Sequence, residues 1–115
     1  MRAIFLEPRH SFVEMLSLVE HCSLFIGNDS GPGILAQAYH RPALILFGAT
    51  DPDKVLFASE ARPIWVDVGC NGCRQWSRNS LFECNTPWCM DRIEPDLVLM
   101  ASASLLNELS TPLQI

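Results

Sequence analysis

Hydrophobic residues recur with helical spacing in two parts of the chain. In SFVEMLSLVEHC the apolar side chains follow an i, i+3, i+4, i+7 pattern from Phe12, and Ser11 with Glu14 has the sequence of a capping box. We therefore expect a helix over about 11–21. A second apolar stripe predicts a closing helix at about 95–109.

Two short segments are apolar almost throughout instead of alternating. They are SLFIG at 23–27 and ALILFG at 43–48, and this pattern is typical of parallel strands that are covered on both faces. Pro32 suits the first turn of a helix between them, and Arg41-Pro42 would end that helix. The order strand, helix, strand predicts a right-handed βαβ unit.

The remaining segments give weaker signals. AIFLEP at 3–8 and PIWVDVG at 63–69 read as further strands, so the chain would begin inside a domain. Residues 69–92 read as a loop with many Cys, Asn, Gly and Pro residues. A length of 115 residues allows one small domain over 1–115. We predict an α/β fold with a partial doubly wound, Rossmann-like parallel sheet.

Composition narrows the range of partners. The net charge is −5 and the eight Lys and Arg residues are spread along the chain, which argues against a nucleic-acid surface. No apolar run reaches the length of a membrane span, and the first residues do not form a signal-peptide core. We expect a cytoplasmic chain that could meet a membrane-borne substrate at the inner face of the membrane.

An unusual loop follows each of the two apolar strands. In GNDSGPG, Gly31 and Gly33 allow close approach of a ligand, and Ser30 can cap the helix or donate its hydroxyl. In the second loop, GATDP at 48–52, Thr50 offers a second hydroxyl, and Lys54 follows with a positive charge. Because ligands bind at the carboxyl ends of parallel strands, and helix amides favour anions, we expect a diphosphate site on this rim. Ordinary tight turns have the same composition, and neither standard nucleotide fingerprint is present, so both interpretations stay open.

The same stretch also resembles a family signature. FIGNDSGPGILAQAYHRPALILFGATDP at 25–52 is similar to the pattern of glycosyltransferase family 9, the heptosyltransferases of lipopolysaccharide assembly. That pattern runs roughly V-x-x-D-[ST]-G-P-x-H-x-A-x-A-x-x-x-P-x-x-x-x-F-G-x-T-x-P. The downstream cysteines and RIEPDLVL also resemble the family's tail. The resemblance covers nearly the whole chain, but only the later part of such an enzyme.

The resemblance implies both an architecture and a reaction. Family members have two Rossmann-like domains, the GT-B architecture, in which the C-terminal domain holds the nucleotide sugar and the N-terminal domain holds the acceptor. This chain would be the second half of the C-terminal domain, and an N-terminal domain outside the chain would supply the catalytic base. The implied reaction is inverting transfer from a nucleotide-diphospho-sugar, typically ADP-heptose, to a lipopolysaccharide core acceptor, without a dinucleotide cofactor. Alone, this chain is expected to be inactive.

The resemblance also assigns individual positions. Asp29 matches the family's acid at the donor sugar, although we do not assign it as the base. The histidine of the pattern is Ile34 here, which keeps open a second interpretation, a degenerate domain that binds a nucleotide or a partner. The residues that match the diphosphate turn and the second loop are Ser30, Gly31, Pro32, Gly48, Thr50 and Pro52.

Four of the five cysteines lie close together in the sequence. Cys70, Cys73, Cys84 and Cys89 have the spacing C-x2-C-x10-C-x4-C. Four thiolates at short spacing can close a tetrahedral structural zinc site, and a reducing compartment favours metal over disulfides. Reduced thiols or occasional disulfides fit equally well, and an iron-sulfur cluster fits less well. A small zinc-stabilised interaction module is therefore a third interpretation of the chain.

Other residues have weaker assignments. Arg74 and Arg78, with Trp76 between them, either face an anionic ligand or lie in a solvated loop with the aromatic ring packed on the domain. We expect packing roles for Trp65, Trp88 and Cys22, and no chemistry for His10, His21 and His40.

Overall fold

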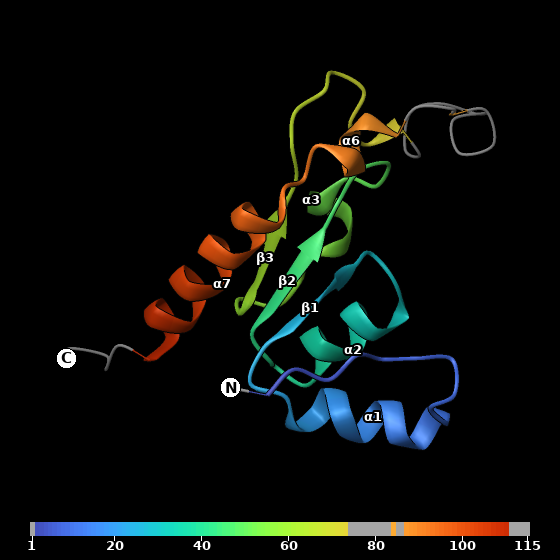
Figure 1. Cartoon of the computed structure of the whole chain (residues 1–115), viewed down its shortest axis with the longest axis vertical. Coiled ribbons are helices and arrows are strands. Elements are labelled where there is room, and N and C mark those ends of the chain that lie inside the picture. Colours follow the sequence, from blue (N-terminus) through green and yellow to red (C-terminus); the bar gives the residue numbers. More distant parts are fainter. Residues whose placement is uncertain (1, 74–83, 85–86, 111–115) are drawn as a thin grey trace.

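Helices and strands alternate along the chain (Figure 1). The computed structural model describes residues 2–73, 84 and 87–110. The elements of these residues are α1 (Phe12–His21), β1 (Phe25–Asn28), α2 (Gly31–Ala38), β2 (Ala43–Leu46), α3 (Pro52–Val55), β3 (Ala61–Ile64), α6 (Trp88–Asp91) and α7 (Pro95–Ser110).

The strands of the described residues form one parallel sheet in the order β1-β2-β3. Ile26 lies opposite Leu44, and Leu46 lies opposite Ile64. α2 connects β1 to β2, and α3 lies in the connection from β2 to β3. The predicted βαβ unit and the α/β fold with a partial doubly wound sheet are confirmed.

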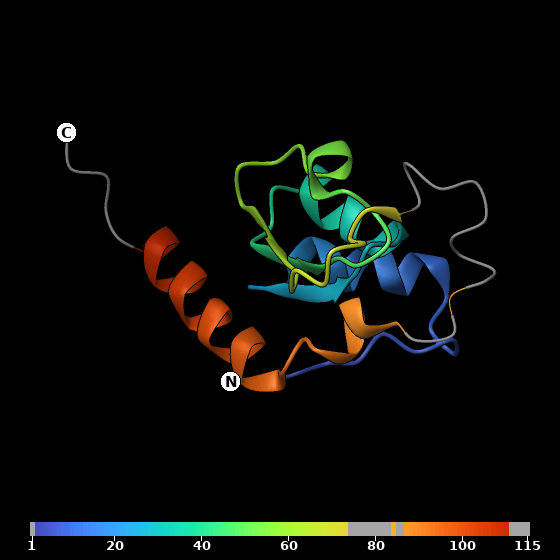
Figure 2. The same cartoon turned by 90° about the horizontal axis from the view of Figure 1, so that it is seen from above.

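Helices cover both faces of β2, the central strand. Ile45 and Phe47 pack in one buried cluster with Val19 of α1, whereas Leu44 packs in a second buried cluster with Leu105 of α7. Figures 1 and 2 show α2 and α3 on one side of the sheet and α7 on the other. Successive side chains of a strand point to opposite faces, so a strand buried on both sides has to be apolar at every position.

The bounds of α1 and α7 were predicted nearly correctly, whereas α2 ends at Ala38, earlier than the predicted end at Arg41-Pro42. At the start of α1, the Glu14 amide donates to Ser11 Oγ at 3.1 Å, and the Ser11 amide donates to Glu14 Oε1 at 3.4 Å, so the capping box is present. Cys22 follows α1 and is half-buried, and its thiol donates to the Val19 carbonyl. Burial raises the pKa of this thiol, and the charge of Arg41 partly opposes that effect.

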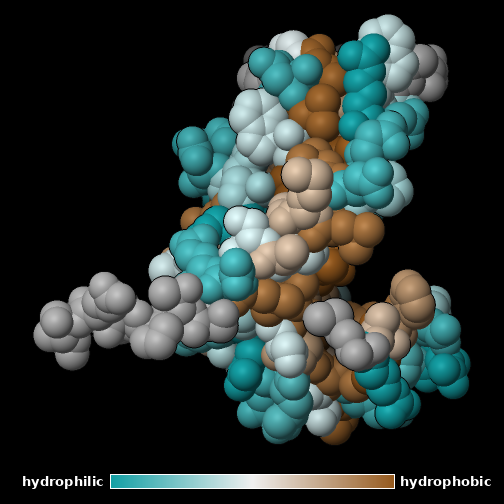
Figure 3. All heavy atoms as spheres, turned by 60° about the vertical axis from the view of Figure 1, so that its left-hand side comes forward, coloured by the Kyte–Doolittle hydropathy of each residue, from teal (hydrophilic) through white to brown (hydrophobic). Residues whose placement is uncertain are grey.

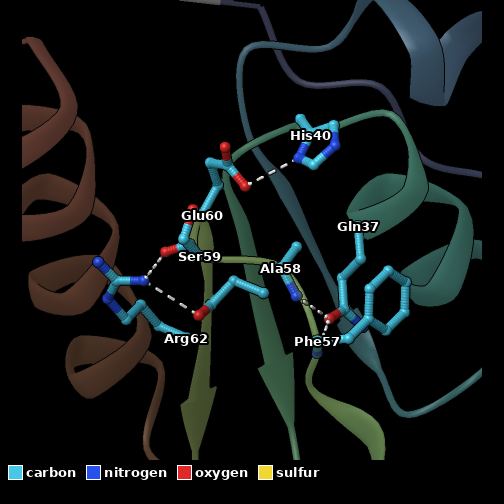
Figure 4. A network of polar contacts seen from close by, with 8 residues as sticks. Gln37, His40, Phe57, Ala58, Ser59, Glu60 and Arg62 are labelled. Carbon is cyan, nitrogen blue, oxygen red and sulfur yellow. Dashed lines mark hydrogen bonds and ion pairs between the residues drawn. The ribbon is translucent and has the colours of Figure 1, made fainter.

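Side-chain contacts of Gln37 and Arg62 surround the start of β3 (Figure 4). Gln37 of α2 is fully buried, and its Oε1 accepts hydrogen bonds from the amides of Phe57 at 2.8 Å and Ala58 at 3.2 Å. These two residues lead directly into β3. On the opposite side, Arg62 of β3 forms an ion pair with Glu108 of α7 at 2.9 Å. The position of the amino end of β3 therefore depends on both α2 and α7.

Two strand predictions were wrong in whole or in part. Residues 3–8 form no strand, and Phe5 is 78% exposed. A strand needs a hydrogen-bonded neighbour, and within the described residues none pairs with this segment. The strand predicted at 63–69 lies earlier, at Ala61–Ile64, because the register with β2 ends at Ile64.

Two helices of four residues each were not predicted. In α3 the Asp51 side chain caps the helix by accepting from the Asp53 amide at 3.0 Å. The other, α6, interrupts the segment predicted as a loop at 69–92. A helix of one turn is too short to produce a periodic apolar pattern, so neither helix could be predicted from apolar spacing.

Large apolar side chains remain exposed on α7 and on β1. They include Ile26 of β1 and Leu97, Leu99 and Met100 of α7. Figure 3 brings this side of the molecule forward and shows apolar side chains gathered on it. Exposed apolar side chains gathered on one side are typical of a surface that another domain or chain covers. No helix within the described residues has the length and hydrophobicity needed to cross a membrane.

Candidate functional site

The two loops that were singled out leave the sheet from adjacent strand ends. Asn28, the last residue of β1, pairs with Leu46, the last residue of β2. The strands are parallel, so both loops begin at the same edge of the sheet. This is the edge at which open α/β sheets bind ligands.

The first loop presents open backbone at the start of α2. Ser30 occupies the N-cap position with extended backbone, but its side chain does not cap the helix; Ser30 Oγ donates instead to the Asn28 carbonyl at 3.2 Å. Gly31 is exposed, and a Cβ built on it would meet no atom within 4 Å. Pro32 has no N–H, and the Gly33 amide already donates to the Ser30 carbonyl at 3.1 Å. The open position is therefore Gly31, and α2 also has no acidic residue in its first turn. This end of α2 can therefore accept an anion.

Gly33 lies in the same turn but in a different environment. It is buried, and a Cβ there would lie 3.3 Å from Ile45 Cδ1 and 3.6 Å from the Asn28 carbonyl oxygen. Because Gly33 has no side chain, α2 can pack closely on β2 at this position. Asp29, which precedes the turn, is half-buried.

The second loop is enclosed by segments from later in the chain. Gly48 is buried, and its carbonyl accepts a hydrogen bond from the Gly72 amide at 2.8 Å. A Cβ on Gly48 would lie 2.7 Å from Cys89 Sγ and 3.0 Å from Met90 Sδ. Glycine is required here because two separate segments approach the same backbone.

An open pocket of about 490 Å³ lies beyond the ends of β2 and β3. Gly48 and Thr50 of the second loop contribute to it, but no residue of the first loop does. Among the described residues that line this pocket, Asp51, Asp53 and Asp67 are acidic and none is Lys or Arg. Three carboxylates disfavour a phosphate group and suit hydroxyl groups instead. The two loops thus share an edge of the sheet but offer different chemistry.

The structure separates Lys54 from this pocket. Lys54 is exposed in the last turn of α3 and does not line the pocket. Its predicted role as a counter-charge for a diphosphate stays a prediction.

Sequence reasoning missed the aromatic wall of the pocket. Trp65 was expected to pack in the domain, but it is 48% exposed and lines the pocket. It follows Ile64, the last residue of β3, so a correct strand end would have placed it on the ligand-binding edge. Trp88 was also expected to pack; it is 54% exposed, and the Arg92 guanidinium lies 5.1 Å from its ring centre.

The cysteines of the candidate metal site are all free thiols. Cys70 and Cys84 are exposed, whereas Cys73 and Cys89 are half-buried. Burial raises the pKa of the Cys89 thiol, and the nearby charges of Cys70, Cys73 and Cys84 add to that shift. Within the described residues, no three His, Cys, Asp or Glu side chains are arranged to hold a metal ion. Structural zinc therefore stays a prediction, and Arg74, Trp76 and Arg78 lie outside the described residues.

Comparison with known proteins places this chain in a family. A family model described as glycosyltransferase family 9 (heptosyltransferase) matches residues 1–82. The chain belongs to glycosyltransferase family 9. Lipopolysaccharide heptosyltransferase 1 of Campylobacter coli is 30% identical to this family 9 chain over 101 residues, which are 88% of this chain and 28% of that protein. Lipopolysaccharide heptosyltransferase 3 of Escherichia coli K12 is 52% identical over 40 residues, 35% of this chain and 12% of that protein.

A solved structure supports the same fold. The structure of E. coli ADP-heptose lipopolysaccharide heptosyltransferase II superimposes with a TM-score of 0.64 and 24% sequence identity. The match covers 85% of this family 9 chain and 26% of that structure. The predicted family resemblance is confirmed, and the chain spans about a quarter of the length of these longer relatives.

Proposed function

We propose that this family 9 chain is the donor-binding part of a heptosyltransferase-type glycosyltransferase. Its donor would be a nucleotide-diphospho-sugar, ADP-heptose, and the sugar would pass to a lipopolysaccharide core acceptor. One observation carries the proposal: in a chain of this family, the loops after β1 and β2 leave the same edge of a parallel sheet. The names of the relatives, two of them lipopolysaccharide heptosyltransferases, support the choice of donor and acceptor.

The different chemistry of the two loops suggests how the donor lies. The start of α2, with open backbone at Gly31 and the hydroxyl of Ser30, suits the diphosphate, since helix amides and the helix dipole favour anions. Asp29 lies just before this turn and would accept a hydrogen bond from a sugar hydroxyl. The acidic pocket with Thr50 and Trp65 suits the uncharged, hydroxyl-rich parts of the donor.

Transfer itself requires parts beyond this chain. An inverting reaction needs a base to take the acceptor proton, and we assign that base and the acceptor site to an N-terminal GT-B domain. The chain then binds donor without completing transfer, at the cytoplasmic face of the membrane where the acceptor is presented. Ile34, which replaces the family histidine and is 48% exposed, supports an alternative in which the chain binds nucleotide but belongs to a degenerate enzyme.

Calorimetry with two ligands tests the proposed orientation of the donor. We expect the chain to bind both ADP and ADP-heptose. In Asp29→Ala, the affinity for ADP-heptose should fall about 10-fold or more because a hydrogen bond to a charged group is lost, whereas the affinity for ADP should not change. Glu20→Ala is the matched control, since Glu20 is an exposed carboxylate on α1.

The possible outcomes separate the claims. Equal loss of ADP and ADP-heptose affinity in Asp29→Ala would place Asp29 at the nucleotide instead of the sugar. Unchanged affinity for both ligands would remove Asp29 from the site. If the wild-type chain binds neither ligand, the chain is not a self-sufficient donor-binding unit and the proposal fails in this form.

A further inference from the structure

Trp65 brings a large aromatic side chain to the pocket beyond the ends of β2 and β3. It is 48% exposed, although it directly follows Ile64, the last residue of β3. Pro63, two positions earlier, is also exposed and lines the same pocket. Two ring side chains thus contribute apolar surface to a cavity of about 490 Å³, a volume in the usual range of small-molecule sites. Because burial of apolar surface is favourable, a ligand that covers Trp65 gains binding free energy.

The polar lining of this pocket can accept hydrogen bonds from a ligand. The Gly69 amide donates to Asp67 Oδ1 at 2.9 Å and so orients that carboxylate. The Asp53 amide orients the Asp51 carboxylate in the same way, at 3.0 Å. A carboxylate has about four acceptor positions, so Asp67 can accept further hydrogen bonds from a bound molecule.

The walls of the pocket are held together by contacts within the chain. The segment that follows β3 returns to the second loop (Figure 1), where the Gly72 amide donates to the Gly48 carbonyl at 2.8 Å. The Asn71 side chain braces this segment, because it accepts from one backbone amide and donates to one backbone carbonyl, both at 2.8 Å. Ligand binding at this pocket therefore requires little ordering of the backbone.

This lining suits an uncharged sugar ring better than a phosphate group or a nucleobase. None of the described lining residues is Lys or Arg, so a phosphate would meet carboxylates without a counter-charge. Adenine could stack on a tryptophan, but it offers a single amino group as donor, whereas the hydroxyls of a sugar donate in several directions. A sugar ring also has a face of C–H groups that can pack on an aromatic ring while its hydroxyls bond at the edges.

We propose that this pocket is a sugar-binding subsite, in which the sugar ring lies on Trp65 and a sugar hydroxyl donates to Asp67. The heptose of the donor and the sugars of the acceptor share this chemistry, and Trp65 is the specificity-determining residue for the one that lies here. The inference deepens the donor-binding proposal and rests on it for the identity of the sugars.

Calorimetry of the full chain with three ligands tests the subsite. The ligands are ADP, ADP-heptose and a heptose-containing core oligosaccharide without phosphate groups. In Trp65→Ala, the affinity for one of the two sugar ligands should fall about 10-fold because the stacking contact is lost, whereas ADP affinity should stay within about 2-fold. A loss for ADP-heptose identifies the donor's heptose as the occupant, and a loss for the oligosaccharide identifies an acceptor sugar.

Two tryptophan variants serve as controls. Trp65→Phe restores an aromatic face and should recover most of the lost affinity. Trp88→Ala is the matched control, since Trp88 is 54% exposed but does not line the pocket, and it should bind all three ligands as the wild type does.

Two further measurements keep the test decisive if Trp65→Ala does not fold. Asp67→Asn retains an oxygen for the Gly69 amide, and it should weaken the same sugar ligand about 3-fold or more because a hydrogen bond to a charged group becomes a neutral one. The sugar ligand should also protect the tryptophan fluorescence of the wild type from quenching by acrylamide. This protection should disappear in Trp65→Phe.

The contradicting outcomes separate the subsite from the donor-binding proposal. Wild-type affinity of Trp65→Ala for both sugar ligands would overturn the subsite. So would an equal loss of ADP affinity, because the nucleoside would then lie on Trp65. A chain that binds ADP, but binds ADP-heptose no more tightly and the oligosaccharide not at all, has nucleotide binding without the subsite. Binding of the oligosaccharide that depends on Trp65 in a chain that does not bind ADP would keep the subsite and overturn the donor-binding proposal.

Discussion

The loops after β1 and β2 leave the same edge of one sheet, yet they differ in almost every physical respect. The first is open: Gly31 is exposed, and nothing lies within 4 Å of the position of its missing Cβ. The second is closed: Gly48 is buried between Gly72 and Cys89. A glycine thus leaves the backbone open to a ligand in the first loop and allows close packing of neighbouring segments in the second.

This difference teaches that a glycine in a signature motif has more than one use. Gly33 of the first loop is itself buried against Ile45, so even within one turn the roles diverge. Ligand binding by backbone amides should depend on the open positions. Stability should depend on the enclosed ones.

The largest difference is expected in stability, when a glycine of each loop is replaced by alanine. Gly48→Ala places a Cβ 2.7 Å from Cys89 Sγ, so α6 or the Cys89 side chain must move, and we expect a loss of about 1–3 kcal/mol in the free energy of unfolding. Gly31→Ala meets nothing and should change stability by less than about 0.5 kcal/mol. Urea denaturation of both variants measures the difference. Equal stabilities would show that the second loop is as permissive as the first.

The next largest effect is expected on ligand affinity when the hydroxyl group of Ser30 or Thr50 is removed. Ser30→Ala removes a hydroxyl beside the start of α2, and we expect ADP affinity to fall about 3- to 10-fold because a hydrogen bond to phosphate is lost. Thr50→Ala alters the acidic pocket and should weaken ADP-heptose while leaving ADP affinity within about 2-fold. Calorimetry with both ligands gives the comparison. If Thr50→Ala weakens ADP more than Ser30→Ala does, the diphosphate lies at the second loop.

A small effect on both stability and binding is expected at Gly33. In Gly33→Ala the new Cβ would lie 3.3 Å from Ile45 Cδ1, the end of a side chain that can shift slightly. The higher helix propensity of Ala offsets this crowding, so we expect stability to change by less than about 1 kcal/mol. ADP affinity should stay as in the wild type, because the position is buried. A clear loss of ADP affinity in a well-folded variant would show that Gly33 contacts the ligand.

Sequence reasoning was most successful where the structure is local. The capping box of Ser11 and Glu14 and the apolar runs around β1 and β2 depend on residues close in the chain, and they were predicted correctly. The end of β3 was misplaced because the apolar run continues past Ile64, where pairing with β2 stops. The exposure of Trp65 and the enclosure of Gly48 depend on segments that meet only in the folded chain, so no local pattern reveals them.

The uncovered side of the sheet has a practical consequence for handling this chain. β1 is an edge strand of the described sheet, its Ile26 side chain is exposed, and α7 also exposes apolar side chains. An unpaired edge next to an apolar surface is a template for association between copies. Binding and stability measurements therefore belong at low protein concentration, with light scattering as a check, so that self-association is not mistaken for ligand binding or folding.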